Sequence, residues 1–353
     1  MTADQKNSVL IDARWIGIGG PGRVAEHLLQ GLHVIDPPGR FIVWGPDAVD
    51  THLWRTARRV PNRRHPKTWY SQREFPGPRG ADAAFFAHHL RPAWRLAPVE
   101  VTTVHDTIPF RYPPNRTLAP AMRAYITWMA RRATLVTTDS QFSKCCIVED
   151  CRVAPERVAV LNLPIDHAST TRIRQLRATA SIEARAVFIG RDAPHKNLDR
   201  LVRAFARTDF ASRGATLTLV GVDGNAVSRL RAIAVARGAR IQLPGVVSQE
   251  QLESLLASSA MLVQPSLEEG FGLPVAEAMA AGVPVVVSSG GALPEILRGA
   301  PVEMFDPLDE DAIAASIDRA ARSPSTCELE WPGPEDFARS VLSAIDQAFA
   351  LAR

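Results

Sequence analysis

Two glutamates separated by seven residues flank a glycine-rich turn, and their chemistry suits the binding of a sugar nucleotide. Glu269 precedes the turn and Glu277 follows it. Carboxylates beside a phosphate pocket can accept hydrogen bonds from sugar hydroxyls, as in ribose recognition by dinucleotide folds. Helix capping and favourable interaction with a helix dipole explain one of these acids. They do not explain why Glu268 and Glu269 stand side by side, because no basic residue lies near them in the sequence.

A strand, a loop, a helix and a second strand must position these acids. The apolar run Met261–Val263 predicts a buried strand, and Val285–Val287 predicts another. Pro274 suits the first helical position, and Gly282 suits the helix end. We expect Glu277 in the first helical turn, and the helix N-terminus is a ready site for an anion.

Two cations follow another predicted strand, at residues 186–190. Arg191 and Lys196 bracket a short loop, and Asn197 is expected to cap the next helix. Preorganised cations at the carboxyl end of a strand can neutralise a diphosphate leaving group. The acids of Asp309–Asp311 are expected to open a helix, so we predict no metal site.

The first half of the chain offers a glycine-rich loop, expected between a strand at residues 9–12 and a helix. Its glycines could cradle a phosphate or serve merely as a turn. No acidic residue closes the following strand, which argues against a dinucleotide site. His105 and Asp106 follow a predicted strand at 101–104, where parallel sheets bind ligands. His88 and His89 end another predicted strand and are candidates on the acceptor side.

Length and composition indicate a soluble globular protein with two domains. The chain has 353 residues, of which 46% are hydrophobic and 22% charged. We predict domains at 1–165 and 166–334, a polar linker over 166–183 and an amphipathic terminal helix. The first residues lack the order of a signal peptide, and four scattered cysteines fit a reducing cytoplasm.

Charge is unevenly distributed along the chain. Residues 1–165 carry 22 Lys and Arg against 14 Asp and Glu, whereas residues 166–353 carry 19 against 23. Residues 54–70 combine six Arg and Lys with two Trp and one Tyr. This segment is either a solvated loop or a contact with an anionic membrane or acceptor. No nucleic-acid-binding module accompanies it.

The run EGFGLPVAEAMAAGVPVV resembles the signature of retaining glycosyltransferases of the GT-B fold, which have two Rossmann-like doubly wound parallel-sheet domains facing across a cleft. The resemblance is to glycosyltransferase family 4, also called glycosyl transferases group 1. It implies that Glu269 contacts the transferred sugar and that Glu277 holds the nucleotide ribose. It also implies that backbone amides around Phe271, Gly272 and Leu273 face the sugar and diphosphate.

The same resemblance assigns further residues. His105 would reach the donor sugar, Arg191 and Lys196 would bind the donor phosphates, and Val246 and Val247 would lie along the base. Gly20 and Gly22 would approach the donor phosphate and the acceptor, and the terminal helix, 335–353, would cross back onto the first domain.

The resemblance implies transfer of a hexose to a glycan or glycolipid hydroxyl in bacterial cell-surface polysaccharide biosynthesis, without a required metal or other cofactor. The stretch VHDTIPF is similar to bacterial mannosyl- and glucosyltransferases and favours GDP-mannose as donor. We expect a cytoplasmic protein, peripheral at the inner membrane face, with no nucleic-acid partner. A nucleotide-sugar epimerase, a phosphorylase and a non-catalytic binding protein remain alternatives on this fold.

Overall fold

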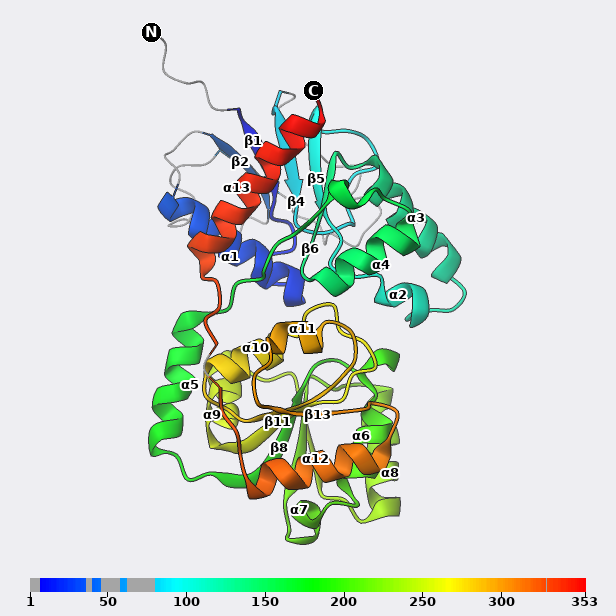
Figure 1. Cartoon of the computed structure of the whole chain (residues 1–353), viewed down its shortest axis with the longest axis vertical. Helices are drawn as coiled ribbons and strands as arrows, with labels where there is room; N and C mark the ends of the chain where they lie inside the picture. The colour runs from blue at the N-terminus through cyan, green and yellow to red at the C-terminus, as the bar shows by residue number, and fades with distance from the viewer. Residues whose placement is uncertain (1–6, 36–39, 46–57, 62–79, 328) are drawn as a thin grey trace. The chain divides into compact units, whose positions relative to one another are not determined.

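The computed structural model describes residues 7–35, 40–45, 58–61, 80–327 and 329–353 (Figure 1). The chain divides into two compact units. The first comprises 1–110, 115–164 and 332–353, and the second comprises 111–114 and 165–331. Most of the basic segment 54–70 lies outside the described residues. No helix among the residues described is long and apolar enough to cross a membrane.

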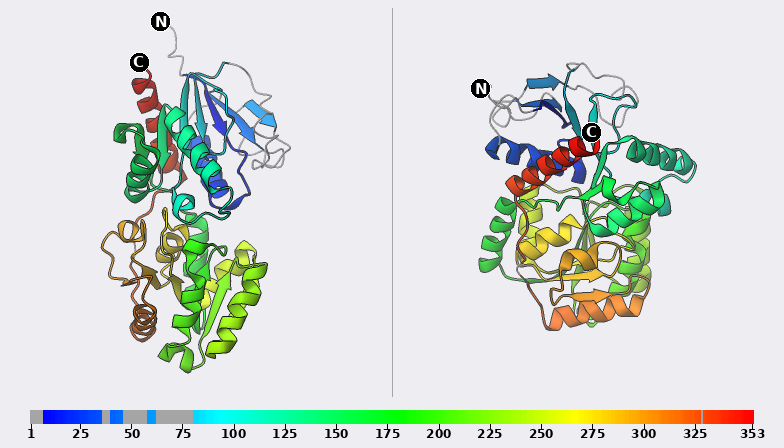
Figure 2. Two further views of the ribbon diagram at one scale, coloured as in Figure 1. Left: turned by 90° about the vertical axis from the view of Figure 1, so that its right-hand side faces the viewer. Right: turned by 45° about the horizontal axis from the view of Figure 1, so that its top comes forward.

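The first unit is built on a parallel sheet of seven strands in the order β3-β2-β1-β4-β5-β6-β7. Helix α1 packs with α13, and α3 packs with α4 (Figures 1 and 2). The strands are β1 Val9–Asp12, β2 Phe41–Gly45, β3 Arg58–Pro61, β4 Ala83–Phe86, β5 Val99–Thr103, β6 Leu135–Thr138 and β7 Val158–Val160. The helices are α1 Gly19–Ile35, α2 Ile108–Arg111, α3 Ala119–Arg132, α4 Gln141–Cys151, the short η3 Pro155–Arg157 and α13 Pro334–Leu351.

The second unit has a parallel sheet of six strands in the order β10-β9-β8-β11-β12-β13. Helices α6, α8 and α12 form one packed group, and α5, α9 and α10 form another. The strands are β8 Glu183–Ile189, β9 Thr216–Val220, β10 Ile241–Gly245, β11 Ser259–Gln264, β12 Val285–Ser288 and β13 Glu303–Phe305. The helices are α5 His167–Thr179, η4 Pro194–Lys196, α6 Leu198–Phe205, α7 Asp209–Ser212, α8 Asn225–Arg237, α9 Gln249–Ser258, α10 Leu273–Ala280, α11 Leu293–Leu297 and α12 Glu310–Arg322.

Strand order determines where ligands can bind. In the second sheet the chain runs outward from β8 to β10 and then returns to β11 on the other side of β8. The loops after β8 and β11 therefore diverge at the carboxyl ends of these strands, which is a topological switch point, the place where open α/β sheets bind ligands. The first sheet has the same arrangement at β1 and β4.

Apolar residues drive both folds, because a parallel sheet covered on two faces needs strands that are apolar throughout. The core of the second unit joins Phe188 of β8 and Met261 of β11 to Phe205 of α6, and all three are fully buried. In the first unit, α13 packs so closely on α1 that a Cβ at Gly31 would lie 2.0 Å from the carbonyl oxygen of Pro334. A glycine is therefore required at this contact.

Three local predictions were wrong. The expected linker 166–183 forms α5, where the Asp166 side chain accepts a hydrogen bond from the Ser169 amide and so caps the helix. Helix α1 begins at Gly19, so Gly20 lies in its first turn and not in a loop. Asn197 makes no side-chain cap to α6, because its Oδ1 accepts from Arg200 NH1 over 2.6 Å, while its amide nitrogen donates to the carbonyls of residues 265 and 307.

Candidate donor site in the second unit

The centre of the candidate site is an ion pair between the loops that follow β8 and β11. Lys196 Nζ lies 2.6 Å from Glu269 Oε1. The two side chains are 18% and 8% exposed, so the pair is largely shielded from water. The fold thus joins the two residues assigned to the donor sugar and the donor phosphates, although 72 residues separate them in the sequence.

Two neutral side chains complete the surroundings of the Glu269 carboxylate. Ser266 Oγ donates to Oε1 over 2.6 Å, and Gln264 Nε2 donates to the same oxygen. Burial alone would raise the pKa of Glu269, but Lys196 and Ser266 outweigh it and hold the pKa below its usual value. The carboxyl is therefore ionised at neutral pH and acts as an acceptor, not as an acid.

The loop that carries Glu269 rests on two glycines after β12. A Cβ at Gly291 would lie 2.4 Å from the backbone nitrogen and oxygen of Glu269, and one at Gly290 would lie 2.5 Å from the carbonyl oxygen of Leu267. The amide of Ala292 donates to the Glu269 carbonyl over 2.9 Å. These contacts fix the loop before any ligand arrives, as preorganised binding of charge requires.

Helix α10 begins directly after this loop. Gly272 precedes it with φ +102°, a conformation that favours glycine. Within the described residues, the amides of Phe271, Gly272 and Leu273 donate to no protein acceptor. Free amides at a helix start carry partial positive charge and suit a phosphate or sugar oxygen.

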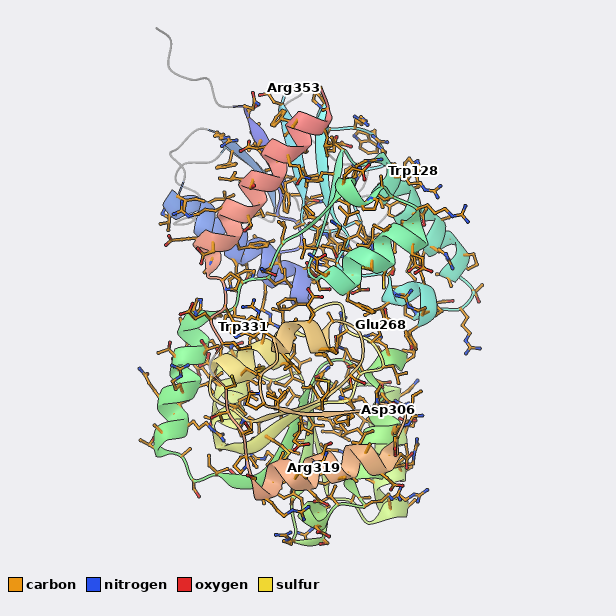
Figure 3. The ribbon with its side chains drawn as sticks, in the orientation of Figure 1. Trp128, Glu268, Asp306, Arg319, Trp331 and Arg353 are labelled. Atoms are coloured by element: carbon orange, nitrogen blue, oxygen red, sulfur yellow. The ribbon has the colours of Figure 1, made fainter. Side chains whose placement is uncertain are left out.

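The expectation that Glu268 and Glu269 lack basic partners was wrong for both. Besides the Lys196 contact of Glu269, Arg111 holds Glu268 through two hydrogen bonds, from Nε over 2.8 Å and from NH2 over 2.5 Å (Figure 3 labels Glu268). Arg111 belongs to the second unit although the chain around it belongs to the first. A partner 157 residues away gives no local sequence signal.

The other predicted donor contacts lie around this centre. Arg191 is exposed in the loop after β8, and no contact of its side chain is described. Glu277 is the fifth residue of α10, so it lies beyond the first turn where we expected it. Val246 follows β10 and is 81% exposed, and Val247 beside it is half-buried.

His195, which precedes Lys196 in η4, also lies within the site. Burial, with a smaller effect of the Lys196 charge, lowers its pKa to about 4, so the ring is neutral at physiological pH. The His195 carbonyl accepts a hydrogen bond from the Leu267 amide over 2.7 Å. Its backbone therefore ties the β8 loop to the β11 loop, which sequence reasoning missed.

The predicted residues of the first unit lie at the carboxyl edge of its sheet. His105 follows β5, and its Nδ1 lies 2.8 Å from Asp139 Oδ2. The Asp106 carboxylate accepts from the Ile108 amide over 2.9 Å. His88 stacks on Trp15, with ring centroids 4.0 Å apart.

The two glycines predicted to approach the donor phosphate differ in their surroundings. A Cβ at Gly22 would lie 2.4 Å from the carbonyl oxygen of Trp15, whereas one at Gly20 would meet nothing within 4 Å. Packing therefore requires the glycine at position 22 and leaves position 20 open.

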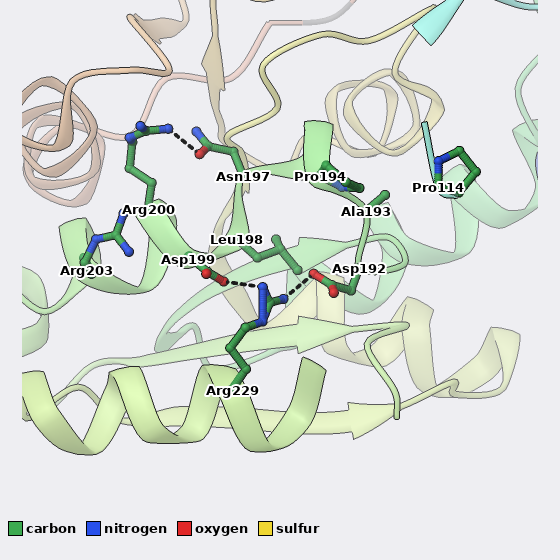
Figure 4. Close-up of a pocket in the computed structure, with 10 residues that line it drawn as sticks. All are labelled: Pro114, Asp192, Ala193, Pro194, Asn197, Leu198, Asp199, Arg200, Arg203 and Arg229. Atoms are coloured by element: carbon green, nitrogen blue, oxygen red, sulfur yellow. Dashed lines mark hydrogen bonds and ion pairs between the residues drawn. The ribbon is translucent and has the colours of Figure 1, made fainter. Parts of the chain in front are cut away.

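A cavity of about 540 Å³ lies beside η4, but neither Lys196 nor Glu269 lines it (Figure 4). In the cavity Arg229 pairs with Asp192 and Asp199, at 2.7 and 2.9 Å. None of the residues assigned to the donor lines this cavity, so we keep the candidate donor site at the switch point. Among the residues described, no cluster of His, Cys, Asp and Glu is arranged to hold a metal ion.

Known proteins resemble the chain in both sequence and fold. Residues 170–329 match the family described as Glycosyl transferases group 1. The MMP alpha-(1->4)-mannosyltransferase of Mycolicibacterium hassiacum is 32% identical over 216 residues, 60% of this chain and 51% of that protein. The O-antigen chain mannosyltransferase B of Escherichia coli is 32% identical over 244 residues, 65% of this chain and 63% of that protein. The chain thus spans about half to two thirds of the length of these curated relatives.

Structural similarity covers more of the chain. The crystal structure of Anabaena HepE in complex with UDP and glucose superposes with a TM-score of 0.66 at 16% identity, covering 98% of this chain and 97% of that one. This likeness, together with the two parallel sheets, confirms the predicted GT-B fold.

Proposed function

We propose that this chain, whose residues 170–329 form a domain of the Glycosyl transferases group 1 family, is a retaining glycosyltransferase. It moves a hexose from a nucleotide-diphosphate sugar to a hydroxyl of a glycan or lipid-linked acceptor. The observation that carries the proposal is the ion pair of Lys196 and Glu269 beside the free amides at the start of α10.

In this mechanism the chain's own charges stabilise the departing diphosphate. Lys196, Arg191 and the amides of residues 271–273 supply positive charge where negative charge develops. Glu269 accepts hydrogen bonds from sugar hydroxyls, because it is ionised and already fixed in place. Glu277 holds the ribose, and Val246 and Val247 lie along the base.

Retention of configuration follows if departure and attack occur on the same face of the sugar. Three donors converge on Glu269 Oε1, which makes this oxygen a poor nucleophile. A double displacement needs a free carboxylate at the anomeric carbon. The donor phosphate is the better base for the acceptor proton, and no metal is needed in this scheme.

The relatives guide the choice of substrates. Two curated relatives are named mannosyltransferases, one of them for O-antigen chains. We therefore favour mannose from GDP-mannose and an acceptor in cell-surface polysaccharide assembly. Peripheral contact with an anionic membrane through residues 54–70 belongs to the same proposal, as does a cytoplasmic location.

The proposal is tested first by binding and then by turnover. A ligand that prefers the native state raises Tm, so GDP, UDP and ADP, with and without their sugars, are compared by thermal shift. The best donor is then incubated with membrane extracts, and the anomeric configuration of the product is read by NMR. Inversion would refute the retaining step, and absence of nucleotide binding would favour a non-catalytic protein.

Variants locate the activity at the site. Glu269→Gln and Lys196→Ala should each lower kcat/KM roughly 10²- to 10³-fold, by analogy with lost oxyanion donors. Glu310→Gln is the matched control, because Glu310 pairs with Arg203 in a half-exposed bridge of the same unit. Equal turnover in all three variants would refute the assignment. Release of an epimer, or cleavage that depends on phosphate, would identify the alternative enzymes.

A further inference from the structure

His105 lies between two hydrogen-bond acceptors supplied by neighbouring strands of the first sheet. It follows β5, while Ala87 follows β4 and Asp139 follows β6, and these three strands are adjacent. Nδ1 lies 2.8 Å from Asp139 Oδ2, and Nε2 lies 3.1 Å from the carbonyl oxygen of Ala87. One ring thus links three strands at the edge where parallel sheets bind ligands.

Both partners restrict the protonation of the ring. A carboxylate and a backbone carbonyl only accept hydrogen bonds, so each ring nitrogen must carry a proton to satisfy its contact. A neutral ring would leave one nitrogen lone pair facing an oxygen in a largely buried position. Such an unmet contact keeps the desolvation cost of the buried groups without the hydrogen bond that offsets it, which favours the imidazolium.

We propose that Asp139 is a positioning residue that, together with the Ala87 carbonyl, keeps His105 doubly protonated, so that the ring serves the transfer reaction as a fixed cation and not as a base. The catalytic part of this inference rests on the proposed function. It also changes the expected contact with the donor sugar, because both N–H groups are already used inside the protein. The ring then acts through its charge and not through a free nitrogen.

The charged and titratable groups around the ring agree with this assignment. Burial would lower the pKa of His105, but Asp139, and to a smaller extent Asp106, raise it above its ordinary value. His88 lies with its ring centroid 5.9 Å away. Burial, with a smaller effect of the His105 charge, lowers the pKa of His89 to about 3, so His89 is neutral.

The charge state is tested by ¹⁵N NMR of the full chain, which needs no substrate. The chain has nine histidines, so the spectrum of His105→Gln assigns the signal. At pH 7 both ring nitrogens of His105 should have the shifts of a protonated imidazolium. In Asp139→Asn the titration midpoint should move to lower pH, and Asp106→Asn should move it less. A lone-pair nitrogen on His105 at pH 7 in the wild type would overturn the inference. If His105→Gln does not fold, correlations between the backbone and the ring of the wild-type protein assign the signal instead.

The catalytic role is tested by the pH profile of kcat/KM. If His105 acts as a cation, kcat/KM should stay high at pH values below the His105 pKa and fall as pH rises through it. In Asp139→Asn this fall should occur at a lower pH than in the wild type. A base predicts the opposite limb, with activity lost as pH falls through that pKa, and this result would overturn the proposal. No turnover with any donor would remove the catalytic role along with the proposed function, whereas the NMR titration decides the charge separately.

Discussion

Gly291 supports the Glu269 loop, and Gly291→Ala should therefore damage both stability and donor binding. The residue has φ +67°, and an added Cβ would lie 2.4 Å from the Glu269 backbone nitrogen and oxygen. Gly282 has nearly the same φ, +72°, but a Cβ there would meet nothing within 4 Å. Gly282→Ala is therefore a matched control that carries the backbone penalty without the clash.

The expected magnitudes follow from this difference. Gly282→Ala should cost about 1 kcal/mol of unfolding free energy, from the left-handed backbone alone. Gly291→Ala should cost that amount plus about 1–3 kcal/mol, because the overlapped atoms are backbone and cannot rotate away. Moving the loop also displaces Glu269 from Lys196.

Denaturant unfolding measures the stabilities, and thermal shift with the best nucleotide measures binding. The nucleotide-dependent rise in Tm should survive in Gly282→Ala and disappear in Gly291→Ala. If the two variants lose equal stability and both keep the rise, the loop is not held by this contact and the reasoning fails.

Three further predictions use the same approach. Lys196→Ala should destabilise the protein at neutral pH, because burial then raises the pKa of Glu269, and the difference from wild type should shrink as acid protonates that carboxyl. Glu253 of α9 accepts hydrogen bonds from Arg172, and they lower its pKa to about 2. The ionised Glu253 therefore stabilises the fold above about pH 4.5, and this stabilisation is lost as pH falls toward 2. The shift in pKa corresponds to at most about 3 kcal/mol of unfolding free energy, which we reduce to about 1–2 kcal/mol because Arg172 is half exposed. In Glu253→Gln, the unfolding free energy should therefore change less with pH over this range. Gly22→Ala should lower Tm through its backbone clash, whereas Gly20→Ala should leave Tm unchanged or raise it, and the opposite order would contradict the packing described at α1.

Local sequence signals predicted helices and strands correctly where the residue type favours a single local structure. Asp309 was expected at a helix start, and its side chain caps α12. Val285–Val287 was expected to form a buried strand, and it lies in β12. The polar segment 166–183 misled because its composition resembles a linker, while its helix is fixed by packing of α5 on α9. Propensity alone does not report such a tertiary contact.

The chemistry of the site was predictable, but its connections were not. The types of Lys196 and Glu269 indicated anion and sugar binding, yet their direct contact depends on β8 and β11 being neighbours. Gly291 carried no signal, because a glycine required by close approach looks in sequence like any other turn residue. The partner of Glu268, Arg111, was invisible for the same reason: only the fold brings it near.

Both sheet edges hold largely buried carboxylates beside basic side chains, and energetics favour a functional reason for this pattern over a structural one. In the second unit Glu269 pairs with Lys196, and in the first Asp139 contacts His105, which we propose to be protonated. Removing charges from water costs several kcal/mol per ion, and a buried pair often gains no more than well-packed apolar residues would. Folding alone therefore gives little reason to keep ions at both edges. A reaction that develops negative charge gives a direct reason, because fixed cations stabilise it without reorganisation, and the acids hold those cations in position.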